Sequence, residues 1–195
     1  MISAIVLAAG MSTRMGSPKA LLEWEGESLA SYQVSQLRQA GVEDVVIVLG
    51  YRSDEVARTL RRAQCRIMNN ARYFTGRAGS LRIGTKAVNR DSDAIIVVNV
   101  DQPRPASFYR ELIAAHLPER AATRPAHGAR TGHPVIVSQR LREELLAVSD
   151  EEDGLRGVLR RHENELGSYE AGELALVDMN TPDEYEAAKS ASPIA

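Results

Sequence analysis

Two runs of the chain, residues 45–49 and 94–98, are apolar at every position, and they restrict the possible folds more than any other feature. A strand with one face in water alternates apolar and polar side chains, so these two strands are expected to be buried on both faces. Amphipathic stretches with helical periodicity separate the apolar runs. This alternation is typical of a parallel sheet covered by helices and predicts an α/β fold.

The other expected elements continue this alternation. Strands are predicted near residues 5–7, 65–68, 121–123, 134–137 and 174–177, and helices over about 28–39, 54–63, 81–88, 106–115, 141–148 and 155–161. The second half is less regular, with a loop through Gly128 and Gly132, which indicates an insertion or an antiparallel excursion. The run Thr181-Pro182-Asp183-Glu184 predicts a helix start with threonine as the N-cap and proline at the first helical position.

Length and charge indicate one ordinary domain. The chain has 195 residues, with 24 Lys and Arg against 26 Asp and Glu, a net charge of −2. We expect a single domain over residues 1–190 and a frayed tail over 191–195. Interspersed charges of near-neutral balance disfavour binding of nucleic acid. One cysteine and four scattered histidines suit neither a disulfide nor a zinc site. We also expect no signal peptide and no membrane span, and place the protein in the cytoplasm.

The segment after the first strand contains Gly10, Arg14, Gly16 and Lys19. Free backbone N–H groups and two positive charges following a strand suit a polyphosphate. The spacing differs from a Walker A loop, because five residues separate the glycines and Pro18 precedes the lysine, and it also differs from a dinucleotide-binding loop. From spacing alone, a glycine turn with surface charges explains the segment equally well.

Several segments together resemble the molybdenum-cofactor nucleotidylyltransferases, a MobA-like family. In the order of the family they are residues 7–19, 76–81 (Gly-Arg-Ala-Gly-Ser-Leu), 101–103 (Asp-Gln-Pro), 132–135 (Gly-His-Pro-Val) and 178–182 (Asp-Met-Asn-Thr-Pro). The resemblance covers nearly the whole chain. It implies a Rossmann-like three-layer α/β/α sandwich with a mixed, mostly parallel sheet, the fold of nucleotide-diphospho-sugar transferases.

The resemblance also implies where a nucleotide binds. The nucleotide-binding residues would be Leu7, Ala8, Ala9, Gly10, Arg14, Lys19, Gly79 and Ser80. Cytidylyl relatives have Leu-Ala-Ala-Gly and Pro-Lys, as this chain does, whereas guanylyl relatives have Leu-Ala-Gly-Gly and Asp-Lys, so CTP is expected. The methyl group of Ala9 would narrow the base site in favour of a pyrimidine. Gly79 and Ser80 can offer hydrogen bonds to a cytosine edge, and a helix-capping serine is the alternative.

Asp101 follows an apolar strand at the carboxyl edge of the sheet, where α/β folds bind ligands. A single carboxylate facing a polyphosphate suffices to bind Mg²⁺, and a turn aspartate before a proline is the alternative interpretation. The resemblance makes Asp101 a metal ligand and assigns the second ligand position to Asn180, where relatives have a carboxylate, with Asp178 as its substitute. It makes Arg14, Lys19 and Asp101 the catalytic residues.

The second substrate would contact Gln102, His133 and Pro134, again by resemblance. Arg77 stands where relatives have methionine and is a cation without an assigned role. The acidic run at residues 150–153 is interpreted as the solvated start of a helix, although the Gly154 segment that follows resembles the family's substrate cleft.

The reaction implied by the resemblance is transfer of CMP from CTP to molybdopterin cofactor, giving molybdopterin cytosine dinucleotide and pyrophosphate, with Mg²⁺ as the cofactor. A molybdenum hydroxylase is the expected receiver of the product. Guanylyl transfer from GTP to molybdopterin and nucleotidyl transfer to a sugar or alcohol phosphate are the enzymatic alternatives. The departures at Arg77, Gly79 and Asn180 motivate a third hypothesis, a carrier that delivers the cofactor without catalysis.

Overall fold

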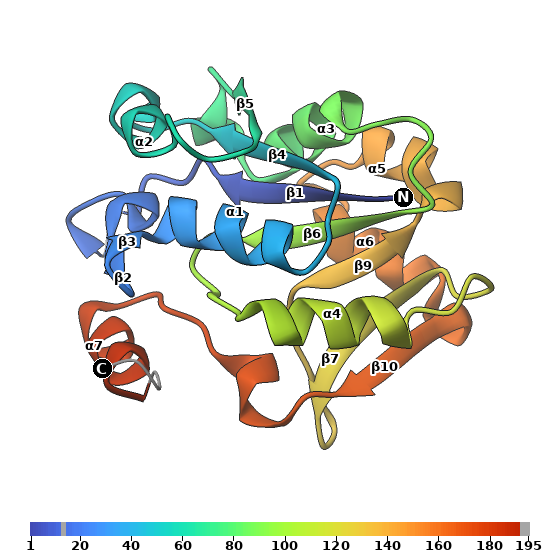
Figure 1. Cartoon of the computed structure of the whole chain (residues 1–195). Coiled ribbons are helices and arrows are strands. Elements are labelled where there is room, and N and C mark those ends of the chain that lie inside the picture. Colours follow the sequence, from blue (N-terminus) through green and yellow to red (C-terminus); the bar gives the residue numbers. More distant parts are fainter. Residues whose placement is uncertain (13–14, 192–195) are drawn as a thin grey trace.

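A computed structural model describes residues 1–12 and 15–191. Its centre is an eight-stranded sheet with helices on both faces (Figure 1). The sheet contains β1 (Ile2–Ala8), β4 (Asp44–Leu49), β5 (Arg66–Asn69), β6 (Ala94–Asn99), β7 (Ala122–His127), β8 (Arg130–Thr131), β9 (Val135–Ser138) and β10 (Leu166–Glu170). The helices are α1 (Leu29–Gln39), α2 (Ser53–Thr59), α3 (Ala78–Ala87), α4 (Ala106–Ala115), α5 (Arg142–Ala147), α6 (Gly154–Arg161) and α7 (Pro182–Ala191), and a separate hairpin pairs β2 (Glu23–Trp24) with β3 (Glu27–Ser28).

The strand order is β10-β7-β9-β6-β1-β4-β5, with β8 pairing β7 outside this path. β1 lies between β4 and β6 and is parallel to both, so the carboxyl ends of these three strands meet at one edge. β9 is antiparallel to β6 and to β7. The mixed, mostly parallel sheet between two helical layers confirms the predicted α/β/α sandwich, and the antiparallel excursion lies where the sequence indicated.

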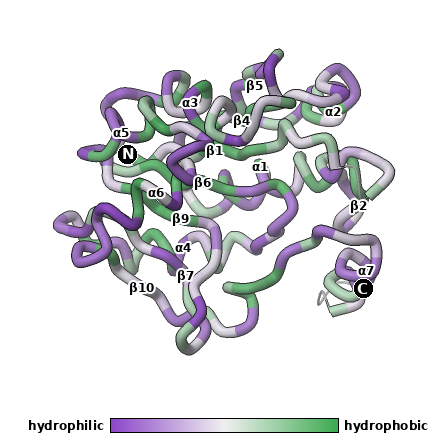
Figure 2. Tube along the Cα trace, turned by 180° about the vertical axis from the view of Figure 1, so that it is seen from behind, coloured by the Kyte–Doolittle hydropathy of each residue, from purple (hydrophilic) through white to green (hydrophobic). Residues whose placement is uncertain are grey.

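Burial of the central strands follows from their composition. Residues 45–49 of β4 are at most 1% exposed, and residues 94–98 of β6 at most 3%. Alternate side chains of β1 enter different cores: Ala4 and Val6 pack with α1, α2 and α4, whereas Ile5 packs with α3, α5 and α6. Hydrophobic residues are accordingly concentrated along the central strands (Figure 2). The expectation that both faces of β4 and β6 are buried is confirmed.

The start of α7 has the predicted capping arrangement. Thr181 Oγ1 accepts a hydrogen bond from the backbone N–H of Glu184 at 3.3 Å, and Glu184 Oε2 accepts one from the backbone N–H of Thr181 at 3.0 Å. This reciprocal pair satisfies backbone donors that the first helical turn leaves open. The helix extends to Ala191, so Ser190 and Ala191 are helical, and the remainder of the expected frayed tail, residues 192–195, lies outside the described residues.

The strand predicted at residues 174–177 is wrong. Residues Gly172–Leu176 form a 3-10 helix, and the last strand is β10, which begins eight residues before the predicted one. Two carbonyl groups of this segment, those of Ala175 and Val177, accept hydrogen bonds from Nη2 of the buried Arg104 at 3.4 and 2.9 Å. They are therefore bonded to a side chain instead of a neighbouring strand. β10 lacks an all-apolar run and pairs only with β7, so its sequence signal is weak.

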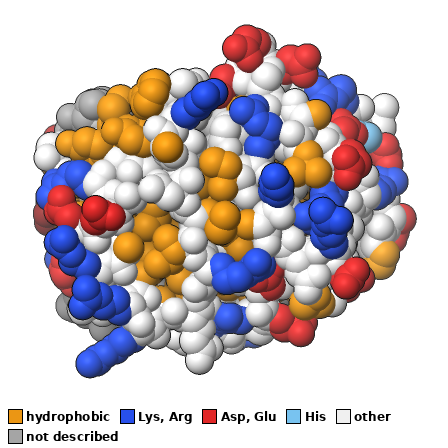
Figure 3. Space-filling model, turned by 90° about the horizontal axis from the view of Figure 1, so that it is seen from above, with side chains coloured by type: hydrophobic (Ala, Val, Ile, Leu, Met, Phe, Trp, Pro, Cys, Tyr) orange, Lys and Arg blue, Asp and Glu red, His pale blue; other side chains and the backbone are white. Residues whose placement is uncertain are grey.

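The surface mixes both signs of charge with apolar patches. Figure 3 shows the face above α2, β5 and α3, where lysines, arginines and acidic residues surround exposed apolar side chains. None of the helices in the described part of the chain is both long and apolar enough to span a membrane.

Candidate active site

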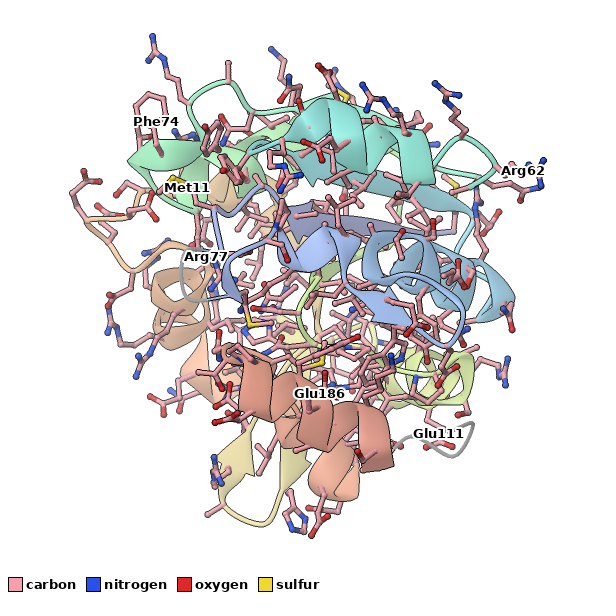
Figure 4. The ribbon with its side chains drawn as sticks, turned by 90° about the vertical axis from the view of Figure 1, so that its left-hand side faces the viewer. Met11, Arg62, Phe74, Arg77, Glu111 and Glu186 are labelled. Carbon is pink, nitrogen blue, oxygen red and sulfur yellow. The ribbon has the colours of Figure 1, made fainter. Side chains whose placement is uncertain are left out.

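A cavity of about 270 Å³ lies at the carboxyl ends of β1 and β6. Figure 4 looks onto this edge of the sheet, where Met11, Phe74 and Arg77 lie on one side of the view and Arg62 and Glu111 on the other. The cavity brings together most residues that the sequence assigned to nucleotide and metal: Leu7, Ala8, Ala9, Gly10, Lys19, Ser80, Asp101 and Asn180. Arg14, the other predicted catalytic cation, lies outside the described residues.

The polar centre of this cavity consists of Lys19, Asp101 and Asn180. Lys19 Nζ donates hydrogen bonds to Asp101 Oδ2 at 2.7 Å and to Asn180 Oδ1 at 2.8 Å. The side chains of Lys19 and Asp101 are 12% and 22% exposed, so the ion pair is largely shielded from water. Two oxygen atoms from residues 79 positions apart in sequence therefore converge on one position that a cation, here an ammonium group, occupies.

Local structure explains this convergence. Lys19 begins a 3-10 helix, Lys19–Leu21, after Pro18, and its backbone N–H donates to Ser12 Oγ at 3.1 Å. Asp101 follows β6, and its carbonyl group accepts a hydrogen bond from the backbone N–H of Met179 at 3.1 Å. This bond joins the turn after β6 to the turn before α7, which places Asn180 beside Asp101.

The donor set is suitable for a divalent cation that binds together with a polyphosphate. Asp101 offers a carboxylate oxygen and Asn180 an amide oxygen, the hard ligands that Mg²⁺ prefers. Within residues 1–12 and 15–191, no three His, Cys, Asp or Glu side chains gather into a metal-binding group. An ion at this position would thus take its other ligands from phosphate oxygens and water.

The loop after β1 is held close to the loop after β4. The Ala9 carbonyl group accepts a hydrogen bond from the backbone N–H of Tyr51 at 3.2 Å. A Cβ at Gly50 would lie 2.7 Å from that carbonyl oxygen and 2.5 Å from Cβ of Tyr73, so only glycine allows this approach. Tyr73 in turn lines the cavity and contacts the rings of Tyr51 and Phe74.

The positions of Gly79 and Ser80 do not support the alternative interpretation, in which Ser80 caps a helix. α3 begins at Ala78, so both residues lie inside its first turn. Ser80 is 4% exposed, lines the cavity, and accepts a hydrogen bond from Asn70 Nδ2 at 2.9 Å through its Oγ. Gly79 lies next to Asn70, which a Cβ at Gly79 would approach to 3.5 Å. Ser80 is thus part of a buried side-chain pair instead of a cap.

A second cavity of about 360 Å³ adjoins the first and shares Leu7, Arg77 and Asn99 with it. His133 lines it, and the Nδ1 atom of this side chain is buried and has no hydrogen-bond partner among the described residues. Burial, followed by the charges of Arg77 and Arg104, lowers the pKa of His133 to about 4, so the imidazole is neutral at pH 7.

Other predicted site residues lie nearby without lining either cavity in the described part of the chain: Gly79, Gln102, Pro134 and Asp178. Gln102 Oε1 accepts a hydrogen bond from Asn99 Nδ2 at 2.8 Å, and Pro134 is buried behind His133, with which it forms a cis peptide bond. Asp178 is exposed, whereas Asn180 contacts Lys19. Of the two candidates for the second metal ligand, Asn180 therefore lies near Asp101, and the exposed Asp178 does not bond to Lys19.

The acidic run has a different role from the one expected for Asp150. The Oδ1 atom of Asp150 accepts hydrogen bonds from the backbone N–H groups of Arg77 and Ala78, at 2.9 and 3.1 Å. Asp150 is exposed, as expected, but it caps α3 from a distant loop and does not lie at the start of α6. Only Asp153 directly precedes α6, and its carboxylate pairs with Arg160 at 2.9 Å.

Sequence reasoning missed three polar residues of the first cavity, Ser12, Tyr73 and Asn99, and the apolar Ala20 and Val100. Asn99 is the first polar residue after the apolar run of β6, so the topological rule that selected Asp101 also applies to it. Ser12 lies in the loop after β1 and supports Lys19 through the hydrogen bond to its backbone. Nothing in the spacing of Tyr73 indicated its position.

Comparison with known proteins extends these observations. Residues 4–166 match the MobA-like NTP transferase domain. The nicotine blue oxidoreductase of Paenarthrobacter nicotinovorans is 29% identical, over 82% of this chain and 82% of its own. The molybdenum cofactor cytidylyltransferase of Escherichia coli is 26% identical, over 96% and 95%. Among solved structures, Rv0371c of Mycobacterium tuberculosis superposes with a TM-score of 0.85 at 24% identity, over 97% of both chains, and it has also been solved in complex with manganese.

Proposed function

The chain belongs to the MobA-like NTP transferase family, whose members include nucleotidyltransferases, and from this premise we propose that it transfers CMP from CTP to the phosphate of molybdopterin cofactor. The products are molybdopterin cytosine dinucleotide and pyrophosphate. The observation that carries the proposal is the convergence of Lys19, Asp101 and Asn180 on one cation position beside the loop after β1.

The reaction needs positioning and charge neutralisation more than covalent chemistry. The acceptor phosphate attacks the α-phosphorus of CTP in line, a new P–O bond forms, and the bond to pyrophosphate breaks on the opposite side. Because the acceptor is already ionised near pH 7, no side chain has to remove a proton. This agrees with a second cavity whose histidine, His133, is neutral and is suited to hydrogen bonding.

The charged side chains have separate tasks. Lys19 and Arg14 stabilise the negative charge on the attacked and leaving phosphates. Asp101 and Asn180 are the residues that would hold Mg²⁺, whose contribution when bound is to neutralise phosphate oxygens. Because Lys19 Nζ bonds to both of these oxygens, a metal ion could take its position only if the ammonium group turned from Asp101 toward the phosphates.

The preference for CTP rests on the loop after β1. Ala9 lines the cavity and is 6% exposed, and its methyl group would leave less room for a purine than a glycine at this position. Ser80 lines the same cavity, and its hydroxyl group, bonded to the buried Asn70, would be available to the edge of the base. A molybdenum hydroxylase is the partner we propose to take up the product.

The test is pyrophosphate release with Mg²⁺ and each of CTP, GTP, ATP and UTP, in the presence and absence of molybdopterin cofactor. We expect release from CTP that requires the cofactor and falls by roughly 100-fold or more in Asp101→Ala. The matched control is Asp178→Ala, which removes an exposed carboxylate two residues from Asn180 and should leave the rate unchanged. Preference for GTP would indicate guanylyl transfer, and silence with every nucleotide from a folded protein would favour another acceptor or a carrier.

A further inference from the structure

Among the described residues, Arg77 is the one cation that lines both cavities. It directly precedes α3, and Figure 4 shows it at the carboxyl edge of the sheet, on the same side as Met11 and Phe74. The first cavity also contains Lys19, and the second contains Arg156. A group that passes from one cavity to the other therefore meets Arg77 at their boundary.

Both ends of Arg77 are held in place. Its Nη2 donates a hydrogen bond to Asn99 Oδ1 at 2.5 Å, and Asn99 Nδ2 donates to Gln102 Oε1 at 2.8 Å. Its backbone N–H donates to Asp150 Oδ1 at 2.9 Å. Arg77 is an exposed residue, but Asn99 is only 6% exposed, so a buried, oriented amide anchors one end of the guanidinium group.

The guanidinium group of Arg77 forms no ion pair with a carboxylate of the described residues, although Asp101, Asp150 and Asp153 line the same cavities. Its side-chain hydrogen-bond partner, Asn99, is uncharged. Guanidinium has five N–H donors in a planar arrangement, and the bond to Asn99 uses one of them. The remaining donors suit two oxygens of a phosphate, which arginine binds in a bidentate manner. The charge also acts inside the second cavity, where it contributes to the lowered pKa of His133.

We propose that Arg77 binds the phosphomonoester of the acceptor and positions it at the boundary of the two cavities. This rests on the proposed function, in which the triphosphate occupies the cavity of Lys19 and Asp101 and the acceptor occupies the adjoining one. The attacking oxygen must reach the α-phosphorus, so the acceptor phosphate has to lie where the cavities meet. Asn99 and Gln102 are positioning residues in this arrangement, because they orient the guanidinium group without entering the reaction.

The decisive variants are Arg77→Met, which keeps an unbranched apolar stem and removes the guanidinium group with its charge, and Arg77→Lys, which keeps the charge and removes the planar donor pair. The control is Arg72→Met, which removes an exposed arginine from the same loop that lines neither cavity. In all three variants the backbone N–H of residue 77 can still bond to Asp150, so α3 should keep its cap. Thermal unfolding of each variant verifies that the fold is retained.

Two measurements are made on each protein: equilibrium binding of molybdopterin cofactor without nucleotide, and steady-state KM values for molybdopterin and CTP from pyrophosphate release. For Arg77→Met we expect the dissociation constant and the KM for molybdopterin to rise roughly 10- to 100-fold, with the KM for CTP within about twofold of wild type. Arg77→Lys should recover part of the loss, and Arg72→Met should behave as wild type.

The outcomes separate this inference from the proposed function. If the wild type turns over and Arg77→Met keeps the wild-type dissociation constant and KM for molybdopterin, the inference alone is overturned. An equal rise in the KM for CTP would also overturn it, because it would assign Arg77 to the triphosphate. Molybdopterin binding that depends on Arg77 without any pyrophosphate release would overturn the proposed reaction and support the binding role. Absence of molybdopterin binding to the wild type would contradict both.

Discussion

Replacement of Lys19 by alanine should have opposite effects on metal binding and on turnover. The Lys19 ammonium group occupies the position between Asp101 Oδ2 and Asn180 Oδ1, at 2.7 and 2.8 Å, where we place the divalent cation. A lysine bonded to both oxygens would therefore compete with the metal ion. Its removal frees both oxygens, whereas the same change deletes a cation from the reacting phosphates.

The size of the gain in divalent-cation affinity follows from the exposure of the Lys19–Asp101 ion pair. Exposed pairs contribute up to about 1 kcal/mol and fully buried pairs about 3–5 kcal/mol when one partner is removed. With side chains 12% and 22% exposed, the Lys19–Asp101 pair lies between these limits, and we take about 1–2 kcal/mol. That corresponds to a divalent-cation affinity roughly 5- to 30-fold higher in Lys19→Ala. Loss of one group that stabilises transition-state charge should lower kcat by roughly 100- to 1,000-fold.

The assay is titration of the nucleotide-free protein with Mn²⁺, followed by its paramagnetic resonance signal, in parallel with pyrophosphate release from CTP. The control is Lys86→Ala, which removes an exposed lysine of α3 outside both cavities. Normal turnover in Lys19→Ala would remove this lysine from the mechanism. Weaker Mn²⁺ binding in the same variant would refute the competition between lysine and metal.

Two further predictions concern stability. The pKa of His133 in the folded protein, about 4, lies below its ordinary value of 6.5. Between these two pH values the unfolded chain therefore binds more protons than the folded protein. The free energy of unfolding should accordingly fall by up to about 3 kcal/mol as the pH falls from 6.5 to 4. The free energy of unfolding in urea, measured at pH 7 and at pH 4.5, should differ less in His133→Asn than in the wild type. An equal difference in the two proteins would contradict the lowered pKa of His133. Asp150→Ala removes the acceptor from two backbone N–H groups at the start of α3 and should lower the free energy of unfolding in urea by about 1–2 kcal/mol. The control Asp153→Ala breaks an exposed ion pair and should lower it by less than about 1 kcal/mol. Equal losses in the two variants would show that Asp150 is not a cap.

The sequence was most informative where one local rule decides the structure. All-apolar runs lead to strands buried on both faces, and β4 and β6 follow this rule. The Thr181 helix start follows from the capping preference of the first turn alone. β10 has no such signal, because an edge strand that pairs with one neighbour needs no continuous apolar run. The 3-10 segment before α7 is decided by Arg104, whose position depends on the tertiary fold.

The site shows the same division. Topology predicts that Asp101 and the loop after β1 meet, because the carboxyl ends of parallel strands share an edge. The choice between Asn180 and Asp178 depends on the turn that the Met179 N–H makes with the carbonyl group of Asp101, which no local pattern encodes. Asp150 is a similar case, since its partners at the start of α3 lie more than 70 residues away in sequence.

The central claim is tested most directly by the identity of the product. Wild-type protein is incubated with molybdopterin cofactor, Mg²⁺ and equal concentrations of CTP and GTP, and the dinucleotide formed is separated and its mass determined. We expect molybdopterin cytosine dinucleotide in excess, with none formed by Asp101→Ala. A guanine dinucleotide as the main product would contradict the assigned base preference, and absence of any dinucleotide, from a folded protein that binds both substrates, would contradict nucleotidyl transfer to this acceptor.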